Sequence, residues 1–382
     1  MNTLPLGGLI VLELSQFLSG PSAGLRLADL GARVIKIEPP LGDAGRKVSI
    51  KNLWVGDDSL LFHTINRNKE SFTADISSPD DVLIVKKLIE KADVLTHNFQ
   101  PGVMDKAGLG YKIVQEINPR IIYAEISGYG KKGPWKDRSG QDLLLQSMSG
   151  LVYTTGNEKD NPVPFGLSIA DNFCGAQLVQ GILGALIRRH KTGRGALVEL
   201  SLMESLIDFQ FELLTTYHSS GKLPKRSSVN NGHPLLSAPY GIYATSDSYI
   251  AIAMMNIQKL AATIHCDALQ PFSQEDTFSR RDEIKTILSG HLLRQSASFW
   301  LELLHAEDLW AMEVLDWDRL TNHEAYRCLE MEQVITSSHG EEMITTRCPI
   351  RINGQKLFSS KPAPRLGAHN ESILNEFLKQ LV

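Results

Sequence analysis

The stretch GLIVLELSQFLSGPSAGLRLADLGARVIKIE, residues 8–38, is the part of the chain that decides the fold class. Its first seven residues, 8–14, form an almost continuous apolar run, which is typical of a strand covered on both faces. Pro21 then predicts the start of a short helix that ends at Gly31, and residues 33–37 predict a second strand. A strand, a helix and a strand of this length indicate parallel strands joined by a helical crossover.

The same alternation continues along the first 217 residues. Further strands are predicted at 71–75, 93–96, 120–126 and 195–202, and helices at 82–90, 103–116, 175–190 and 203–217. Repeated units of this kind predict an α/β fold: a doubly wound, largely parallel, Rossmann-like sheet with helices on both faces.

A change in composition indicates a second, smaller domain. Residues 218–231, HSSGKLPKRSSVNN, are polar, basic and rich in Gly, Ser and Pro, as in a linker. Residues 240–254 predict a hairpin with its turn at 246–248, and helical patterns follow to about Leu315. We therefore predict a large domain at 1–217 completed by 330–382, a linker at 218–231 and a small α+β domain at 232–329.

The overall composition excludes several classes of protein. The 382 residues carry 39 basic and 43 acidic side chains, a net charge of −4, and this gives no reason to expect a nucleic-acid or membrane-surface partner. No apolar stretch reaches the ~20 residues that span a bilayer, and no basic residue precedes the N-terminal apolar run. We expect a soluble cytoplasmic protein. Four widely spaced cysteines argue against a disulfide framework and a structural zinc site: Cys174, Cys266, Cys328 and Cys348.

Glycine-rich loops follow the predicted strands and indicate where a ligand binds. In an open parallel sheet, ligands bind beyond the carboxyl ends of the strands, and glycines there allow close approach to backbone N–H groups. Each loop alone is ordinary for an α/β fold, whereas four together favour a site: 15–21, 38–45, 98–102 and 127–134. Basic residues available to an anionic ligand near these loops are Arg46, Lys106, Lys131, Lys132 and Arg138.

A dinucleotide site is the first alternative for this crevice. Glu38 lies where an acid that binds ribose would stand. The first loop, however, carries only Gly20 and Gly24 and does not supply the G-x-G-x-x-G spacing of the pyrophosphate turn. Nicotinamide binding is therefore the weaker hypothesis.

Asp171 stands where an extended segment is predicted to turn into the helix 175–190. As a pattern, it is consistent with a helix N-cap or with a carboxylate nucleophile or base, and the pattern leaves both open. Glycines inside a helix cost about 1 kcal/mol each relative to alanine. Gly175, Gly181 and Gly184 therefore predict a neighbouring backbone or ligand packed closely against this helix. Its predicted buried face comprises Leu178, Val179, Ile182, Leu183, Leu186 and Ile187.

Several ordered motifs together resemble one known family. Besides residues 8–43, they include NRNKESFTADI, ADVLTHNFQPGVMDKAGLGY, INPRIIYAEISGYGKKGP, GLSIADNFCG and KTGRGALVELSLMESL. On these motifs the chain resembles the family III CoA-transferases, the group of the formyl-CoA:oxalate and carnitine CoA-transferases. The alpha-methylacyl-CoA racemases are related to that group.

The resemblance implies a fold, a mechanism and a set of site residues. It implies a large doubly wound domain, a small domain, and two subunits threaded through each other as an interlocked homodimer. The family's catalytic aspartate corresponds to Asp171, which would attack the thioester of an acyl-CoA to form a mixed anhydride, with an aspartyl-CoA thioester as a further intermediate. A small carboxylic acid would then accept CoA, and no cofactor beyond the CoA thioesters is implied. The implied substrate and CoA contacts are Leu18, Ser19, Ala74, Asp75, Ile76, Ser77, Asn98, Phe99, Gln100, Lys106, Ser139, Gly140, Gln141 and Asp142.

The sequence departs from the family's relatives at several positions. Gln141 stands where the racemases carry a histidine base and Asn256 where they carry an acid, which disfavours proton exchange at an alpha carbon. Leu18 replaces the glutamine of formyl-CoA transferases, which argues against that substrate pair, and Pro39 replaces an arginine that stacks on adenine. A CoA-transferase is the leading hypothesis, and an acyl-CoA isomerase and a catalytically silent CoA-binding protein are the alternatives.

Overall fold

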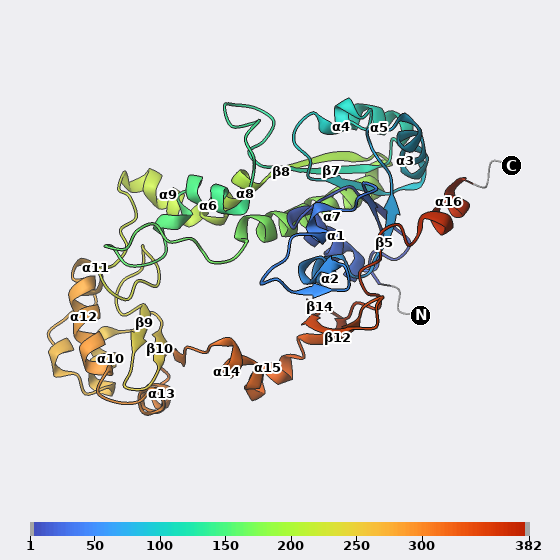
Figure 1. The fold of residues 1–382 in the computed structure, drawn as a ribbon. Helices are drawn as coiled ribbons and strands as arrows, with labels where there is room; N and C mark the ends of the chain where they lie inside the picture. The colour runs from blue at the N-terminus through green and yellow to red at the C-terminus, as the bar shows by residue number, and fades with distance from the viewer. Residues whose placement is uncertain (1–3, 379–382) are drawn as a thin grey trace. The chain divides into compact units, whose positions relative to one another are not determined.

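The computed structural model describes residues 4–378, and a single parallel sheet organises their N-terminal part (Figure 1). In the described chain, this sheet has six strands in the order β5-β2-β1-β6-β7-β8, and every neighbouring pair is parallel. The parallel α/β sheet predicted from the sequence is thus confirmed. Its strands are β1 (Ile10–Glu13), β2 (Arg33–Glu38), β5 (Lys69–Thr73), β6 (Val94–His97), β7 (Ile122–Ser127) and β8 (Ala196–Ser201).

Helices cover both faces of this sheet, which explains why most residues of its strands are buried. On one face α1 (Ser19–Asp29) packs against α7 (Ile169–Thr192), and α7 also contacts β7 and β8. On the other face α3 (Pro79–Lys91), α5 (Tyr111–Ile117) and α16 (Asn370–Leu378) enclose a core with the strands. Figure 1 shows α3, α4 and α5 grouped together over one side of the sheet.

Several element boundaries differ from those predicted. Helix α1 begins two residues before Pro21 and β5 begins two residues before Ser71. The helix predicted over 103–116 is two helices, α4 (Val103–Lys106) and α5, because Gly108 adopts a left-handed φ of 69° between them. Likewise α8 (Leu202–Phe209) and α9 (Phe211–Ser220) replace one predicted helix.

The predicted buried face of α7 is partly wrong. Ile187 is 62% exposed, whereas Ala185 and Arg189 are buried in its place. The residues that face the core, at positions 178, 182, 185 and 189, are separated by four, three and four residues and so lie on one face of the helix. Ile187 lies off this face. Arg189 is accommodated in this stripe because its Nη1 pairs with the Asp93 carboxylate at 3.0 Å.

Contacts between residues divide the described chain into two compact units. The first comprises residues 4–145, 168–209 and 329–378, and the second comprises Gln146–Leu167 and Gln210–Cys328. The domain limits given above from the sequence remain predictions. Other elements of the first unit are η1 (Ala44–Arg46), β3 (Trp54–Val55), β4 (Asp58–Ser59), α2 (Leu60–Asn66), β12 (Glu332–Thr336), β13 (Glu342–Thr346), β14 (Cys348–Ile352) and β15 (Gln355–Leu357). Helix α6 (Asp142–Met148) begins at the end of residues 4–145, the first segment of the first unit.

The second unit is built on a small antiparallel sheet. The predicted hairpin is confirmed as β9 (Gly241–Ala244) and β10 (Tyr249–Ile252), and β11 (Ala311–Glu313) pairs with β10. Helices α10 (Ile257–Thr263), α12 (Arg281–Leu292) and α13 (Ala297–Ala306) cover its buried face around Ile250, Leu260 and Leu288. The remaining elements are η2 (Leu151–Tyr153), α9, η3 (Asp267–Leu269), α11 (Asp276–Ser279), α14 (Trp317–Asn322) and α15 (Glu324–Leu329).

Candidate active site

The loops that follow β1 and β6 meet where the strand order of the sheet reverses. The chain passes from β1 outward to β2 and β5, and then returns to place β6 on the other side of β1. Asn98, directly after β6, holds the first loop: its Nδ2 donates to the Gln16 carbonyl at 2.7 Å and its Oδ1 accepts from the Gln16 N–H at 2.8 Å. Such a switch point is the usual ligand crevice of an open parallel sheet.

Close packing of α1 against α7 brings Asp171 to this first loop. Gly175 makes the approach possible, because a Cβ there would lie 2.7 Å from the Ser19 carbonyl oxygen and 2.3 Å from Ser22 Oγ. The Ser19 hydroxyl, at the start of α1, lies beside the Asp171 carboxylate and lowers its pKa. A neighbouring backbone, which is one of the two possibilities predicted for three glycines of α7, is confirmed at Gly175, whereas the close neighbour of Gly181 is the Val198 side chain at 2.7 Å. At Gly184 no described atom outside the helix backbone lies within 4 Å of a Cβ, so no neighbouring backbone is found there.

The environment of Asp171 suits a carboxylate that reacts. Burial and the neighbouring Asp142 charge raise the pKa of Asp171 to about 6, and the Ser19 hydroxyl acts in the opposite direction. Asp142 Oδ2 accepts from the Asp171 backbone N–H at 3.0 Å, which holds the two acids side by side. At neutral pH the Asp171 side chain is therefore mostly anionic, poorly solvated and available as a nucleophile.

The helix-capping interpretation of Asp171 is wrong. Helix α7 begins at Ile169, six residues earlier than predicted, so Asp171 lies within its first turn and Ser168 is the N-cap residue. Ser168 with an acid three residues later, S-x-x-D, is a helix-start pattern that the sequence interpretation missed, although Ser168 makes no side-chain cap hydrogen bond in the structure. Cys174, one turn along the helix, is no rival nucleophile, because burial raises the pKa of its thiol to about 12.

The other predicted contact residues lie in loops at the same edge of the sheet or beside it. Residues 74–77 follow β5, where Asp75 accepts from the Ser77 N–H and hydroxyl in the turn before α3. Residues 98–100 follow β6, and residues 139–142 lead into α6 after Gly140 packs on Gly128. Lys106 is exposed at the end of α4. The structure thus brings Ser19, Asn98, Asp142 and Asp171 together, while CoA binding by the full set remains a prediction.

Two of the basic candidates are already paired within the protein. Arg46 is 2% exposed and forms a two-pronged pair with Glu38 at 2.7 and 2.8 Å, so its guanidinium is not free for a phosphate. The same pair lowers the pKa of Glu38 and occupies the carboxylate that a dinucleotide ribose would need. Lys131 binds Glu125 and also Glu199, the latter at 3.1 Å.

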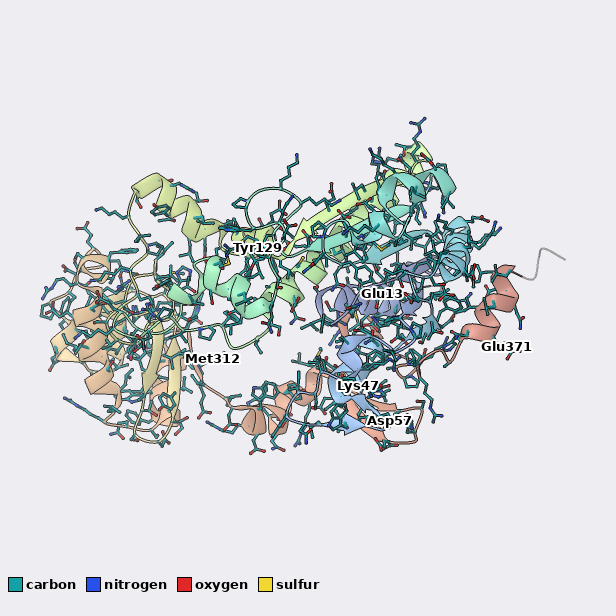
Figure 2. The ribbon with its side chains drawn as sticks, turned by 45° about the horizontal axis from the view of Figure 1, so that its top comes forward. Glu13, Lys47, Asp57, Tyr129, Met312 and Glu371 are labelled. Atoms are coloured by element: carbon teal, nitrogen blue, oxygen red, sulfur yellow. The ribbon has the colours of Figure 1, made fainter. Side chains whose placement is uncertain are left out.

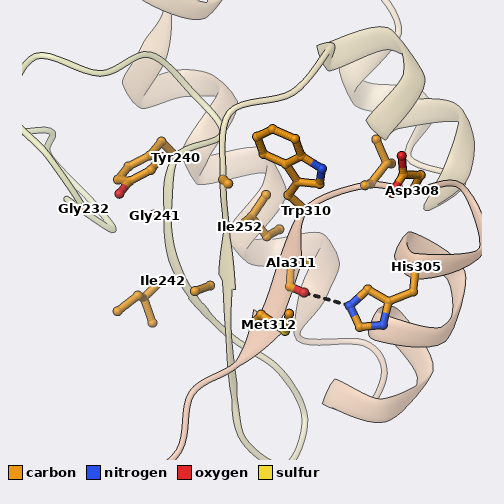
Figure 3. A pocket seen from close by; sticks show the side chains of 13 residues that line it. Gly232, Tyr240, Gly241, Ile242, Ile252, His305, Asp308, Trp310, Ala311 and Met312 are labelled. Carbon is orange, nitrogen blue, oxygen red and sulfur yellow. Dashed lines mark hydrogen bonds between the residues drawn. The ribbon is translucent and has the colours of Figure 1, made fainter. Parts of the chain in front are cut away.

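Two cavities lie outside the immediate surroundings of Asp171. One cavity, of about 310 Å³, lies beside the ends of β6 and β7 and is lined by the predicted contacts Phe99 and Gln100 together with His97 and Glu125. The other, about 670 Å³, belongs to the second unit and lies on the sheet of β9, β10 and β11 (Figure 3). Its wall is mainly apolar, with Trp310 and Met312, and His305 Nε2 donates to the Ala311 carbonyl at 2.8 Å.

Three classes of feature are missing from residues 4–378. None of the described helices is long and apolar enough to cross a membrane. In this part of the chain, no group of three or more His, Cys, Asp or Glu side chains could hold a metal ion. All four cysteines lie in it as free thiols.

The fold and the site together define a class of protein: a parallel α/β protein that offers a poorly solvated carboxylate at the switch point of its sheet. The family model described as CoA-transferase family III matches residues 6–370, and the chain belongs to that family. It is accordingly an enzyme of the CoA-transferase type, as the sequence predicted.

Named relatives and a solved structure agree with this assignment. The chain is 33% identical to the acetyl-CoA:oxalate CoA-transferase of Acetobacter aceti, over 98% of this chain and 96% of that protein. It is 31% identical to the succinyl-CoA:glutarate CoA-transferase of Homo sapiens, over 99% and 87%. A crystal structure of a CAIB/BAIF family protein from Brucella suis matches with a TM-score of 0.84, 32% identity and coverage of 99% of this chain and 100% of that one.

Proposed function

We propose that the protein moves CoA from an acyl-CoA to a small carboxylic acid, with Asp171 as the covalent nucleophile. The observation that carries this proposal is the Asp171 carboxylate itself, which lies partly buried at the switch point with Ser19 and Asp142 beside it. A carboxylate is a weak nucleophile in water, and partial desolvation beside a positioned substrate raises its reactivity.

The proposed reaction consists of acyl and CoA exchanges on one carboxylate. An Asp171 oxygen attacks the thioester carbon of the donor, the C–S bond breaks, and CoA leaves as the thiolate, giving an aspartyl–acyl anhydride. The thiolate then attacks the aspartyl carbonyl and releases the donor acid, which leaves an aspartyl-CoA thioester. The acceptor carboxylate attacks that thioester, and the freed thiolate finally takes the acceptor acyl group and regenerates Asp171.

The proposed substrates follow from the family and its relatives. Oxalate, glutarate and malate occur in the names of similar transferases, which supports a small dicarboxylic acid as acceptor. We propose that the predicted contact set, from Leu18 and Ser19 through Asp142, binds the donor and its CoA, and that no further cofactor is needed. We also propose an interlocked homodimer in the cytoplasm, as the family resemblance implies.

Two observations weigh against the isomerase alternative. Gln141 is exposed, and its amide does not ionise near neutral pH and so cannot act as a general base. The Asn256 side chain accepts from the Lys259 N–H at 2.9 Å as the N-cap of α10, so it has a local structural task. Neither position supplies the second base that exchange at an alpha carbon requires.

The test is covalent trapping on the wild-type protein. The protein is incubated with formyl-, acetyl-, succinyl- and longer acyl-CoAs in deuterated water, hydroxylamine is added, and peptides are analysed by mass spectrometry. We expect a hydroxamate on Asp171 with at least one donor, and transfer to oxalate, glutarate or malate with that donor. Deuterium at the alpha carbon without any adduct would favour the isomerase, and CoA binding without either change would favour the silent protein.

The rate of covalent adduct formation is expected to depend on the protonation of Asp171 and therefore on pH. Because only the anion attacks, the single-turnover rate of adduct formation should fall about tenfold per pH unit below pH 6. Asp142→Asn removes a like charge and should shift the acidic fall of the rate to lower pH. Ser19→Ala removes an interaction that lowers the pKa and should shift this fall to higher pH. The same pH dependence in wild type and both variants would contradict the assignment of Asp171 as the titrating group.

A further inference from the structure

A cluster of four buried charged side chains lies beneath the first loop of the active site. We call Glu13, Lys36, Asp43 and Lys69 the inner ion cluster, and each is at most 2% exposed. Figure 2 shows Glu13 in the interior of the first unit, among the strands and helices of the sheet. Glu13 binds Lys69 at 2.8 and 3.0 Å and Lys36 at 3.2 Å, and Lys36 also pairs with Asp43 at 2.7 Å. Two positive and two negative charges therefore balance inside the protein.

Stability alone does not account for such a cluster. Well-packed apolar residues of similar volume usually stabilise a fold as well as a buried ion pair does, because desolvation offsets the attraction between the charges.

Three members of the cluster bind the backbone of residues 15–21. Lys36 Nζ donates to the Ser15 carbonyl at 2.8 Å, and Lys69 Nζ donates to the Pro21 carbonyl at 2.9 Å. Between these two points, Asp43 Oδ1 accepts from the Phe17 N–H at 3.4 Å. The segment is thus held from inside the protein at its beginning, its middle and its end.

The held segment needs such support. Phe17 has a φ of 61°, a left-handed conformation that a residue with a bulky side chain seldom adopts unless its surroundings impose it. Its own side chain is 52% exposed and so contributes little packing to keep this conformation. The backbone contacts to the inner ion cluster and to Asn98 therefore help to hold the loop in this conformation.

The segment held by the inner ion cluster is also the one that lies next to Asp171. Ser19 stands inside the held segment, two residues before Pro21, and its carbonyl oxygen packs against Gly175 of α7, one turn from Asp171, whose pKa the Ser19 hydroxyl lowers. Helix α1 also rests directly on the cluster: a Cβ on Gly24 would lie 1.7 Å from Glu13 Oε2, so only glycine leaves room for that carboxylate. A shift of the cluster would therefore move the start of α1, and with it the Ser19 hydroxyl.

We infer that the inner ion cluster is a positioning device for the reaction, which fixes the segment 15–21 from below so that Ser19 meets Asp171 in reactive geometry. Glu13, Lys36, Asp43 and Lys69 are positioning residues, since each acts through the loop and none touches the Asp171 carboxylate. This inference rests on the proposed covalent role of Asp171.

Two charge-balanced double variants test it. Glu13→Gln/Lys69→Met releases the Pro21 carbonyl, and Lys36→Met/Asp43→Asn releases the Ser15 carbonyl, while each leaves one buried pair of opposite charges. With saturating acyl-CoA, we expect single-turnover adduct formation to fall about 100-fold in each, because small misplacements near the reacting atoms have effects of this size. The KM for acyl-CoA should change less than about threefold, since CoA itself is not held by these residues.

A matched control comes from the edge of the cluster. Asn66 Oδ1 accepts from Lys69 Nζ at 2.8 Å but makes no hydrogen bond to the segment 15–21. Asn66→Ala should therefore lower stability and leave adduct formation within about threefold of wild type. Double variants that fold and react at the wild-type rate would overturn the inference.

Two further results separate the possible failures. If wild-type protein forms no adduct on Asp171, the proposed function fails, whereas a reactive wild type with equally reactive double variants refutes only the positioning device. If the variants do not fold, hydrogen exchange of the unliganded wild type decides. The amides of Gln16 and Phe17 should exchange far more slowly than those of the exposed segment 131–133, and exchange at the rate of a free peptide would overturn the inference.

Discussion

The Asp171→Asn protein should lose CoA transfer by about 10⁴-fold or more and, at the same time, be more stable than wild type at neutral pH. The loss of activity follows because an amide cannot form the anhydride. The gain in stability follows because the folded protein pays to keep this carboxylate charged, as its raised pKa shows. Few substitutions other than that of a reactive group combine the two effects.

The sign of the stability effect depends on pH. The pKa of Asp171 rises from 3.8 to about 6 on folding, so the protonated acid is the form that the fold favours. Its contribution to stability is fully present below about pH 4 and is lost as the pH rises through 6. The asparagine variant escapes that loss and should be more stable at pH 7 by about 1–3 kcal/mol, discounted for partial exposure.

Urea unfolding at pH 4 and pH 7 measures this difference. Asp171→Asn should have a higher unfolding free energy than wild type at pH 7 but not at pH 4. Asp137→Asn is the matched control, because that carboxylate is 82% exposed in its side chain and should show neither the gain nor the loss of activity. An Asp171→Asn protein no more stable than wild type at pH 7 would contradict the electrostatic account of the site.

Gly175→Ala should damage both the fold and the site. The new methyl group would meet the Ser19 carbonyl oxygen at 2.7 Å, which is backbone and cannot swing aside. We expect a loss of about 1–3 kcal/mol in unfolding free energy from overpacking. The rate of adduct formation should also fall, because α1 and α7 separate at the point where Ser19 reaches Asp171.

Gly184 of the same helix provides the control. No described atom lies within 4 Å of a Cβ placed there, so Gly184→Ala should gain about 0.5–1 kcal/mol from helix propensity. Chemical denaturation and single-turnover trapping of both variants give the comparison. Equal stability of the two alanine variants would show that the contact between α1 and α7 is less tight than the structure has it.

Much of the sheet followed from local pattern. Residues 8–14 and 33–37 are mainly apolar because helices cover both faces of the strands that they form, and this periodicity is visible in the sequence. The limits of the helices were harder to predict. The start of α7 at Ile169 was missed although Ser168 and Asp171 form an S-x-x-D pattern, and Gly108 divides α4 from α5 through a φ angle rather than a change in polarity.

The inner ion cluster shows what pattern could not predict. In the sequence, Glu13 is a charge that interrupts an apolar run, and Lys36 is a charge within the next strand. Their meeting depends on register, since Glu13 lies opposite Lys36 when β1 pairs with β2. The strand register and the position of Lys69 on β5 depend on the pairing of the whole sheet, and this pairing cannot be predicted from a short stretch of sequence.

The sequence by itself determined the class of fold, the family and the aspartate on which the proposed chemistry depends, because ordered motifs and apolar periods are properties of the chain. Only the tertiary structure decided how that aspartate is tuned. The raised pKa of Asp171 arises from burial and from the charge of Asp142, 29 residues away, and Ser19, across the contact between α1 and α7, opposes part of the rise. Burial and charge act through space, and distance in space exists only once the chain has folded.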